Sequence, residues 1–259
     1  METNKAKEIL RLVDIKMQFG GLMALDGISI SVPKGEIFGI VGPNGAGKTT
    51  LFNVISGILM PTRGKVYFKG EDVTGNLPHK MARMGIGRTF QVVRPFSSLT
   101  VLENVLAAYG ERFYYNLALS FKFYKSKKYI EDAEKILFKV GLIEFRDRKA
   151  SILPLGHQRR LEIARALALN PSMILLDESF SGLSFSEMDE LSELVINLNK
   201  QGITVLIIEH NMPVTVRLCN TIAVLNYGKK IAEGTPHEIV HDPLVIEAYL
   251  GKRRGEKYD

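Results

Sequence analysis

One nine-residue segment constrains the fold of this chain more than any other feature, because it fits the pattern G-x-x-x-x-G-K-[ST]. The apolar run 37–41 before the segment predicts a buried strand, and residues 49–55 after it carry apolar side chains at helical spacing. A strand, a glycine-rich loop and a helix in this order direct backbone N–H groups toward one point, which suits a phosphate. The segment consists of Gly42, Pro43, Asn44, Gly45, Ala46, Gly47, Lys48, Thr49 and Thr50.

The residue types of this segment predict a nucleoside triphosphate site. The glycines allow backbone angles and close approaches that a side chain would block. Lys48 has the reach to contact the β- and γ-phosphates, and the Thr49 hydroxyl is a suitable ligand for Mg²⁺. A chance glycine turn before a helix is the alternative, and the flanking strand and helix weigh against it.

Composition and charge bound the class of protein without deciding its partners. The 259 residues are 46% hydrophobic and 24% charged, which excludes disordered and collagen-like chains. A net charge of +6 suits nucleic acid, an anionic membrane surface and nucleotide phosphates equally. The single cysteine, Cys219, excludes an internal disulfide and fits a reducing compartment. Because the chain has neither a signal-peptide pattern nor a long uninterrupted apolar run, we expect a cytoplasmic protein.

Hydrophobic patterning changes along the chain. Residues 11–17, 24–32 and 64–70 read as strands between glycine turns, which predicts an N-terminal antiparallel region. From about 99 to 153 apolar residues recur at helical spacing, which predicts a helical insert. Later apolar runs at 173–176 and 203–208 alternate with helical patterns and indicate a parallel sheet covered on both faces.

Acidic residues follow one of these buried strands directly. Asp177 and Glu178 come after the run 173–176, at the strand end where ligands bind in open parallel sheets. We expect Asp177 to hold Mg²⁺ and Glu178 to polarise the attacking water. A capping role for Asp177 is the alternative in an isolated strand, and the upstream phosphate loop favours catalysis. His210 follows the next apolar run and is a candidate contact to the γ-phosphate, with helix capping or a surface position as the alternative.

The order of these elements resembles the ATP-binding subunits of ABC transporters over essentially the whole chain. Within that family the chain is most similar to the ATPases of branched-chain amino-acid importers. The segments that carry this likeness are FGGLMAL at 19–25, QRRLEIAR at 158–165, IEHNM at 208–212 and EAYLG at 247–251.

The resemblance implies an α/β fold of the P-loop NTPase (RecA-like) type. A mostly parallel sheet core is expected with an N-terminal antiparallel β region and a helical subdomain insert. Residues 1–259 then form one ATP-binding domain, with 1–98 and 154–259 as the core and about 99–153 as the insert.

The resemblance also assigns roles to residues that chemistry alone does not place. Phe19 matches an aromatic that stacks on adenine, with a core aromatic as the alternative. Gln91 matches a glutamine that contacts Mg²⁺ and the attacking water. Leu155, Gly156 and His157 lie in the signature segment, which completes the ATP site of a second, head-to-tail ATPase subunit, either an identical or a related chain. A groove near 92–103 is expected to receive a short helix from a transmembrane permease subunit.

The chain departs from the family pattern on the side that faces the partner's ATP. The usual signature L-S-G-G-Q is here Leu153-Pro154-Leu155-Gly156-His157, and Pro154 has neither hydroxyl nor N–H. Ser179 replaces a common proline after the catalytic glutamate, and Ser184 stands where the family's dimer-contact loop usually ends in Asp or Asn. We therefore expect intact ATP binding, with a weaker two-chain sandwich and slower turnover.

The sequence as a whole predicts an ATP-hydrolysing subunit that powers a membrane transporter for amino acids of the branched-chain type. ATP and Mg²⁺ are the expected cofactors, permeases and a second ATPase chain are the expected partners, and nucleic acid is not among them. The protein is expected on the inner face of the cell membrane, attached through the permeases. The rival interpretations are a soluble non-transport ABC ATPase and a nucleotide-binding regulatory partner with weak hydrolysis.

Overall fold

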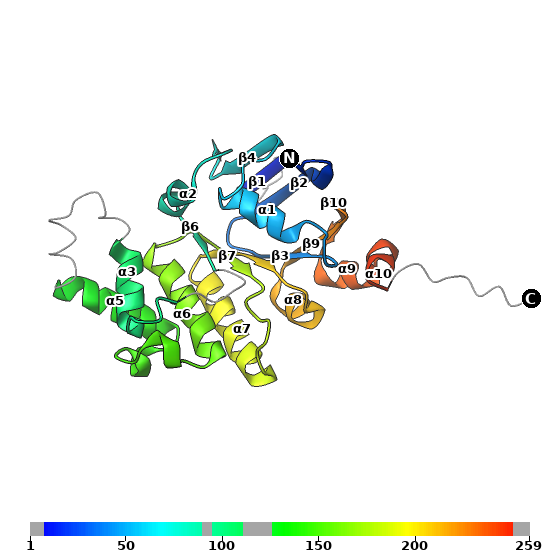
Figure 1. The fold of residues 1–259 in the computed structure, drawn as a ribbon. Helices are drawn as coiled ribbons and strands as arrows, with labels where there is room; N and C mark the ends of the chain where they lie inside the picture. The colour runs from blue at the N-terminus through cyan, green and yellow to red at the C-terminus, as the bar shows by residue number, and fades with distance from the viewer. Residues whose placement is uncertain (1–7, 90–94, 111–125, 251–259) are drawn as a thin grey trace, which may run out of the picture. The chain divides into compact units, whose positions relative to one another are not determined.

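The protein's structure is a computed structural model that describes residues 8–89, 95–110 and 126–250 (Figure 1). The chain divides into two compact units. The first unit comprises Met1–Pro78 and Thr204–Asp259, and the second comprises His79–Ile203. Gln91 and the aromatic segment 113–124 lie outside the described residues.

The first unit contains an antiparallel sheet, as the alternating N-terminal pattern predicted. Its strands have the order β2-β1-β4-β5, and β1 pairs antiparallel with both β2 and β4. Side chains alternate between the buried and exposed faces, with Leu10, Leu12 and Ile15 in the core. The strands are β1 (Glu8–Phe19), β2 (Leu22–Pro33), β4 (Arg63–Phe68) and β5 (Glu71–Asp72).

The first unit also contains parallel strands that are buried on both faces. Strand β3 pairs parallel with β8 and with β9, and β10 pairs antiparallel with β9. Every residue of β3 and β8 is buried, which explains their continuous apolar sequences. The elements are β3 (Ile37–Val41), α1 (Lys48–Ile55), β8 (Thr204–Ile208), α8 (Met212–Leu218), β9 (Thr221–Asn226), β10 (Lys229–Gly234), α9 (Pro236–His241) and α10 (Pro243–Leu250).

Cys219, at the end of α8, is buried where that helix packs closely against β3. A Cβ added at Gly39 would lie 2.8 Å from the Cys219 sulfur, so the glycine lets the helix approach the strand. Burial raises the pKa of the Cys219 thiol to about 12. Cys219 is therefore a small core residue and not a nucleophile.

The second unit is mostly helical around one parallel strand pair (Figure 1). Strand β6 pairs parallel with β7, and helices α3, α5 and α6 pack against one another. Helices occupy most of the described part of 99–153, while the predicted insert boundary itself stays a prediction. The elements are α2 (Pro78–Met84, at the unit boundary), β6 (Ile86–Arg88), α3 (Val101–Gly110), α5 (Lys127–Lys139), two short 3₁₀ turns (Ile143–Phe145 and Ala150–Ile152), α6 (Leu155–Ala168), β7 (Met173–Asp177) and α7 (Phe185–Lys200).

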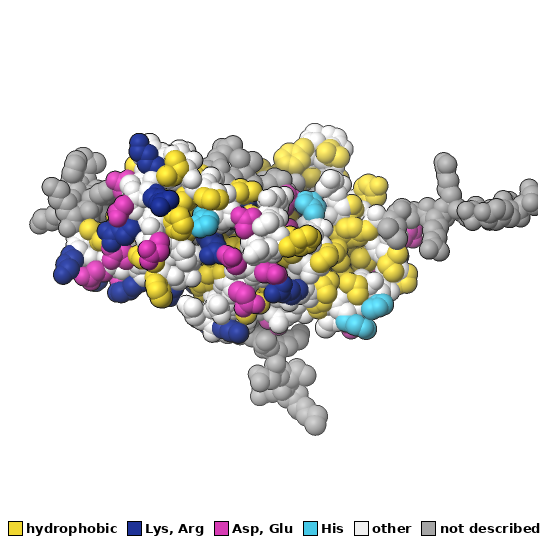
Figure 2. All heavy atoms as spheres, turned by 90° about the horizontal axis from the view of Figure 1, so that it is seen from below, with side chains coloured by type: hydrophobic (Ala, Val, Ile, Leu, Met, Phe, Trp, Pro, Cys, Tyr) yellow, Lys and Arg dark blue, Asp and Glu magenta, His cyan; other side chains and the backbone are white. Residues whose placement is uncertain are grey.

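Charged side chains of the second unit are of mixed sign. Figure 2 shows basic and acidic groups interspersed where this unit is viewed. Lys135 contacts Asp132 at 2.9 Å on α5, and Lys127 lies 3.9 Å from Glu131 on the same helix. Among the described residues, no helix combines the length and the apolar character needed to cross a membrane.

Candidate functional site

The phosphate loop lies between β3 and α1, and its backbone admits only glycine at two points. Gly42 has φ 151° and Gly47 has φ 99°. A Cβ at Gly42 would lie 2.1 Å from the Leu225 carbonyl oxygen, and one at Gly47 would lie 2.6 Å from that of Ala24. Both obstacles are backbone atoms that cannot swing aside. The local fold therefore dictates the glycines that the motif contains.

The start of α1 is suited to an anion. Gly47 is the N-cap, so no side chain caps the first turn, and no acidic residue occupies that turn. The helix N-terminus thus offers N–H groups and the positive end of its dipole. The buried Lys48 ammonium donates hydrogen bonds to the carbonyl oxygens of Gly42 (2.7 Å) and Pro43 (3.0 Å). The cation is held within the loop, which fits the triphosphate that the motif predicted.

A turn distant in sequence supports this loop. Gly228, between β9 and β10, donates its N–H to the Ala46 carbonyl at 3.1 Å and accepts from the Asp26 N–H at 2.8 Å. Tyr227 and Gly228 both have positive φ, as in a tight hairpin turn. Sequence reasoning missed the turn's role, because the pattern reveals the hairpin but not what the hairpin contacts.

Two further predicted residues of the first unit lie on its surface. Phe19 ends β1 and is 45% exposed, next to the exposed Leu22 and Met23, so it is not a core aromatic. His210 is exposed and is the second residue after β8, separated from the strand by Glu209. The cap of α8 is instead Asn211, whose side chain accepts from the Val214 N–H at 3.3 Å. Exposure leaves both Phe19 and His210 accessible to a ligand, and their assigned roles stay predictions.

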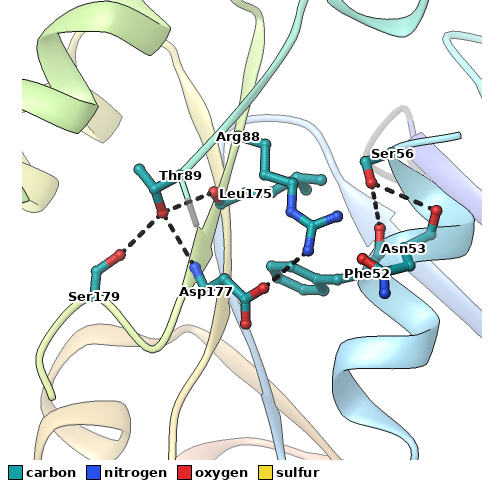
Figure 3. Close-up of polar contacts among 8 residues, drawn as sticks. All are labelled: Phe52, Asn53, Ser56, Arg88, Thr89, Leu175, Asp177 and Ser179. Carbon is teal, nitrogen blue, oxygen red and sulfur yellow. Dashed lines mark hydrogen bonds and ion pairs between the residues drawn. The ribbon is translucent and has the colours of Figure 1, made fainter. Parts of the chain in front are cut away.

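Asp177 ends β7 in the second unit with its two carboxylate oxygens in different environments (Figure 3). Oδ2 accepts a hydrogen bond from Arg88 Nη2 at 2.9 Å, and both side chains are buried. Oδ1 is also buried and has no hydrogen-bond partner among the described residues. Burial raises the pKa of Asp177, and the Arg88 hydrogen bond opposes that rise.

Such an orphaned, buried carboxylate oxygen fits a cation ligand. Mg²⁺ in phosphate sites is held by one or two protein oxygens, with phosphate and water completing its shell. The buried Oδ1 of Asp177, unpartnered within the described part of the chain, therefore fits a metal that is held partly by a nucleotide.

Glu178 has a strained backbone that its neighbours hold in place. Its φ is +49°, in the left-handed region that non-glycine residues rarely adopt, and the residue is only 7% exposed. The Thr89 hydroxyl accepts from the Asp177 N–H at 3.2 Å and lies 3.1 Å from the buried Ser179 Oγ (Figure 3). Asp177 and Ser179, on either side of Glu178, thus both contact the Thr89 hydroxyl. Sequence reasoning did not assign roles to Arg88 and Thr89.

The signature segment forms the first turn of α6, with Pro154 as an N-cap that offers no side-chain hydrogen bond. Gly156 is buried, and a Cβ there would lie 2.6 Å from Oε1 of Glu187 on α7. Hydrogen bonds from Ser184 and from the Gly156 N–H lower the pKa of Glu187. A carboxylate of the same chain therefore occupies the α6 N-terminus, an arrangement that sequence reasoning missed.

The neighbouring signature and loop residues have structural contacts of their own. The His157 ring packs edge-on against Phe145 at 4.6 Å, and burial lowers its pKa, with Arg160 adding to that effect. Leu155 is 39% exposed. Ser184 is the N-cap of α7, where it forms a capping box with Glu187.

The glycine loop on β3 and the acidic end of β7 define the class of this protein as a P-loop nucleotide-binding α/β protein. Comparison with known families agrees. The family model described as "ABC transporter" matches residues 25–181, and that of the "Branched-chain amino acid ATP-binding cassette transporter" matches residues 229–254. The chain belongs to the ABC transporter family, as one of its ATP-binding cassettes.

Similar proteins span nearly the same length. The high-affinity branched-chain amino acid transport ATP-binding protein BraF of Pseudomonas aeruginosa is 42% identical, over 95% of this chain and 99% of its own. LivG of Escherichia coli, with the same description, is 39% identical over the same shares. The crystal structure of the ADP conformation of MJ1267, an ATP-binding cassette of an ABC transporter, has a TM-score of 0.85 at 40% identity and covers 95% of this chain and 99% of its own. The predicted family and fold are thus confirmed.

Proposed function

We propose that this chain is the ATP-binding and ATP-hydrolysing subunit of a membrane transporter for branched-chain amino acids. The observation that carries the proposal is the glycine cradle between β3 and α1, with Lys48 held inside it. The relatives named for branched-chain amino acid transport supply the substrate class.

The predicted site residues have separate roles in binding ATP and Mg²⁺. The loop N–H groups and Lys48 bind the phosphates, while Phe19 stacks on adenine. Thr49, Gln91 and Asp177 are the protein groups that hold or contact Mg²⁺. When bound, Mg²⁺ neutralises charge on the phosphate oxygens.

Two residues act at the γ-phosphate. Glu178 orients and polarises the attacking water, and its left-handed backbone fixes the direction of its side chain. His210 contacts the γ-phosphate by charge or hydrogen bond. Leu155, Gly156 and His157 face the ATP of a second ATPase subunit.

The partners and the location follow from the transporter role. ATP-driven closure acts on the transmembrane permease subunits, which dock on this chain near residues 92–103; of these, 92–94 lie outside the described residues. The protein is then cytoplasmic and peripheral on the inner face of the membrane. A dimeric ATP-binding cassette, MJ0796 bound to ADP and Pi, resembles this chain with a TM-score of 0.73 at 29% identity and covers 88% of this chain and 98% of its own, which supports a two-chain assembly.

The direct test is transport by the assembled complex. The tagged chain is isolated with its membrane subunits, reconstituted into vesicles, and assayed for ATP-dependent uptake of radiolabelled leucine, isoleucine and valine. We expect uptake that is lost with Lys48→Ala. ATP-dependent movement of a different substrate, with none of these three, would refute the proposed substrate class.

One observation favours the second candidate, a regulatory partner with weak hydrolysis: Glu187 occupies the α6 N-terminus that a partner's ATP would use. Sedimentation of Glu178→Gln with and without Mg-ATP separates the candidates, because this change blocks hydrolysis and leaves binding intact. A shift from monomer to dimer only with ATP supports the hydrolytic assembly. A protein that binds ATP and stays monomeric favours the regulatory role or a different partner chain.

A further inference from the structure

The contacts around Asp177 form a small buried polar cluster at the ends of β6 and β7, entirely within the second unit (Figure 3). The register of the parallel pair places Arg88 opposite Leu175. Two consecutive residues, Arg88 and Thr89, consequently reach the segment that begins with Asp177.

Arg88 fixes one side of the Asp177 carboxylate. Its guanidinium bonds Oδ2 at 2.9 Å, with side chains that are 9% and 2% exposed. A charge-assisted bond in such a dry setting is strong and directional. Since Oδ2 is occupied, Oδ1 is the oxygen left for a cation, and it has no hydrogen-bond partner among the residues described.

Thr89 holds the backbone of Asp177 in place. Its hydroxyl donates to the Leu175 carbonyl at 3.4 Å, accepts from the Asp177 N–H at 3.2 Å and contacts Ser179 Oγ at 3.1 Å. These contacts bracket Glu178, whose φ of +49° needs support from its surroundings. One side chain thus holds both the strand end and the turn that follows it.

We propose that Arg88 and Thr89 are positioning residues that hold the Asp177 carboxylate so that Oδ1 ligates Mg²⁺. The inference rests on the proposed nucleotide function and deepens it, because it assigns two residues outside the motifs to the metal. Groups that orient metal ligands commonly change metal affinity by about 10–100-fold when they are removed.

The test measures Mg²⁺ affinity rather than activity. A fluorescent, non-hydrolysable nucleotide (mant-AMPPNP) is bound to the purified full-length chain in EDTA and then titrated with Mg²⁺. The primary variant is Thr89→Val, which removes the hydroxyl and keeps the shape, with Thr89→Ser as its conservative rescue. Arg88→Met removes the guanidinium, and Arg83→Met on the preceding helix is the control for loss of one positive charge.

We expect all variants to bind the nucleotide in EDTA as the wild type does. Half-saturation by Mg²⁺ should rise about tenfold in Thr89→Val and about 10–100-fold in Arg88→Met, while Thr89→Ser and Arg83→Met stay within about twofold of wild type. Mg²⁺ affinities within about twofold of wild type in both Thr89→Val and Arg88→Met would overturn the positioning role. Tighter Mg²⁺ binding in Arg88→Met would overturn it as well, because Arg88 would then compete with the metal. If circular dichroism shows that Arg88→Met does not fold, the pair Thr89→Val and Thr89→Ser decides the question alone.

Two outcomes separate this inference from the function on which it rests. If the wild type binds no mant-AMPPNP with or without Mg²⁺, the proposed function fails and the inference falls with it. If the wild type binds mant-AMPPNP and Mg²⁺, and the variants have the same Mg²⁺ affinity as the wild type, only the positioning role fails.

Discussion

The phosphate loop and the signature turn both place a glycine at the start of a helix, but the two regions depend on that glycine differently. Gly47, at the start of α1, faces a backbone carbonyl and has a left-handed φ of 99°. Gly156, in the first turn of α6, faces the side chain of Glu187. The start of α1 contains no acid, whereas a carboxylate of the same chain lies against the start of α6.

The difference indicates how strictly each region requires its glycine. A backbone atom cannot move without moving the sheet to which it belongs, so the phosphate loop tolerates no side chain at Gly42 or Gly47. The end of the Glu187 side chain can rotate to another rotamer, at the cost of its hydrogen bonds with Ser184 and Gly156. The signature turn is therefore the more adaptable of the two, which agrees with the location of Pro154 and the other departures from the family pattern.

The largest effect is expected from Gly47→Ala. The new Cβ would lie 2.6 Å from the Ala24 carbonyl oxygen, and the left-handed backbone adds about 1–2 kcal/mol of strain. We expect ATP binding to be lost and the melting temperature to fall, as measured by fluorescent-nucleotide titration and thermal unfolding.

Gly45→Ala is the matched control within the same loop. Gly45 also has a positive φ, of 80°, but a Cβ there meets nothing within 4 Å. It therefore bears the strain without the clash, and we expect a smaller loss. Equal losses in the two variants would contradict the steric account of Gly47.

Ser184→Ala should destabilise the chain by about 1 kcal/mol, because the serine caps α7 and N-cap hydroxyls are worth about that much. Chemical denaturation measures the change. ATP binding should stay as in the wild type. A variant of unchanged stability would show that the capping box does not contribute.

Gly156→Ala tests whether the signature turn tolerates a side chain that the phosphate loop does not tolerate at Gly47. Alanine has a higher helix propensity than glycine, which offsets part of the cost of displacing the Glu187 side chain. We expect ATP binding unchanged and stability within about 1 kcal/mol of wild type. If Gly156→Ala abolishes ATP binding as Gly47→Ala does, the distinction between the regions is wrong.

The smallest effect is the pH dependence of the Glu187 cap. Because hydrogen bonds from Ser184 and Gly156 lower the folded-state pKa of Glu187 below 4.5, its contribution to stability is present above pH 4.5 and is lost as the pH falls through the folded value. We expect wild type to melt above Glu187→Gln at pH 6, and the gap to close as the pH falls below 4.5. A gap that widens toward low pH would contradict the assignment.

Local chemistry explains which parts of the site were predictable from the sequence. The phosphate loop and the Asp177-Glu178 pair are formed by consecutive residues beside strongly apolar runs, so the sequence pattern alone predicts their roles. The roles of Arg88 and Thr89 were not predictable, because they depend on the pairing of β6 with β7. Single-sequence periodicity does not determine that pairing.

The contact of Glu187 with Gly156 was also out of reach, since it depends on how α6 and α7 lie together. The capping box of Ser184 and Glu187 was readable, because Ser and Glu three residues apart mark a helix start. The resemblance to the family instead assigns Ser184 to the dimer-contact loop. The structure shows its role within the chain, and the dimer contact stays a prediction.

The most direct test of the account is phosphate release by the wild type and by Glu178→Gln, with ATP binding measured in the same samples. We predict equal ATP binding and a loss of hydrolysis of about 10²–10⁴-fold in the variant, the usual contribution of a general base. A Glu178→Gln protein that releases phosphate at the wild-type rate, or a wild type that binds ATP and releases none, would contradict the account.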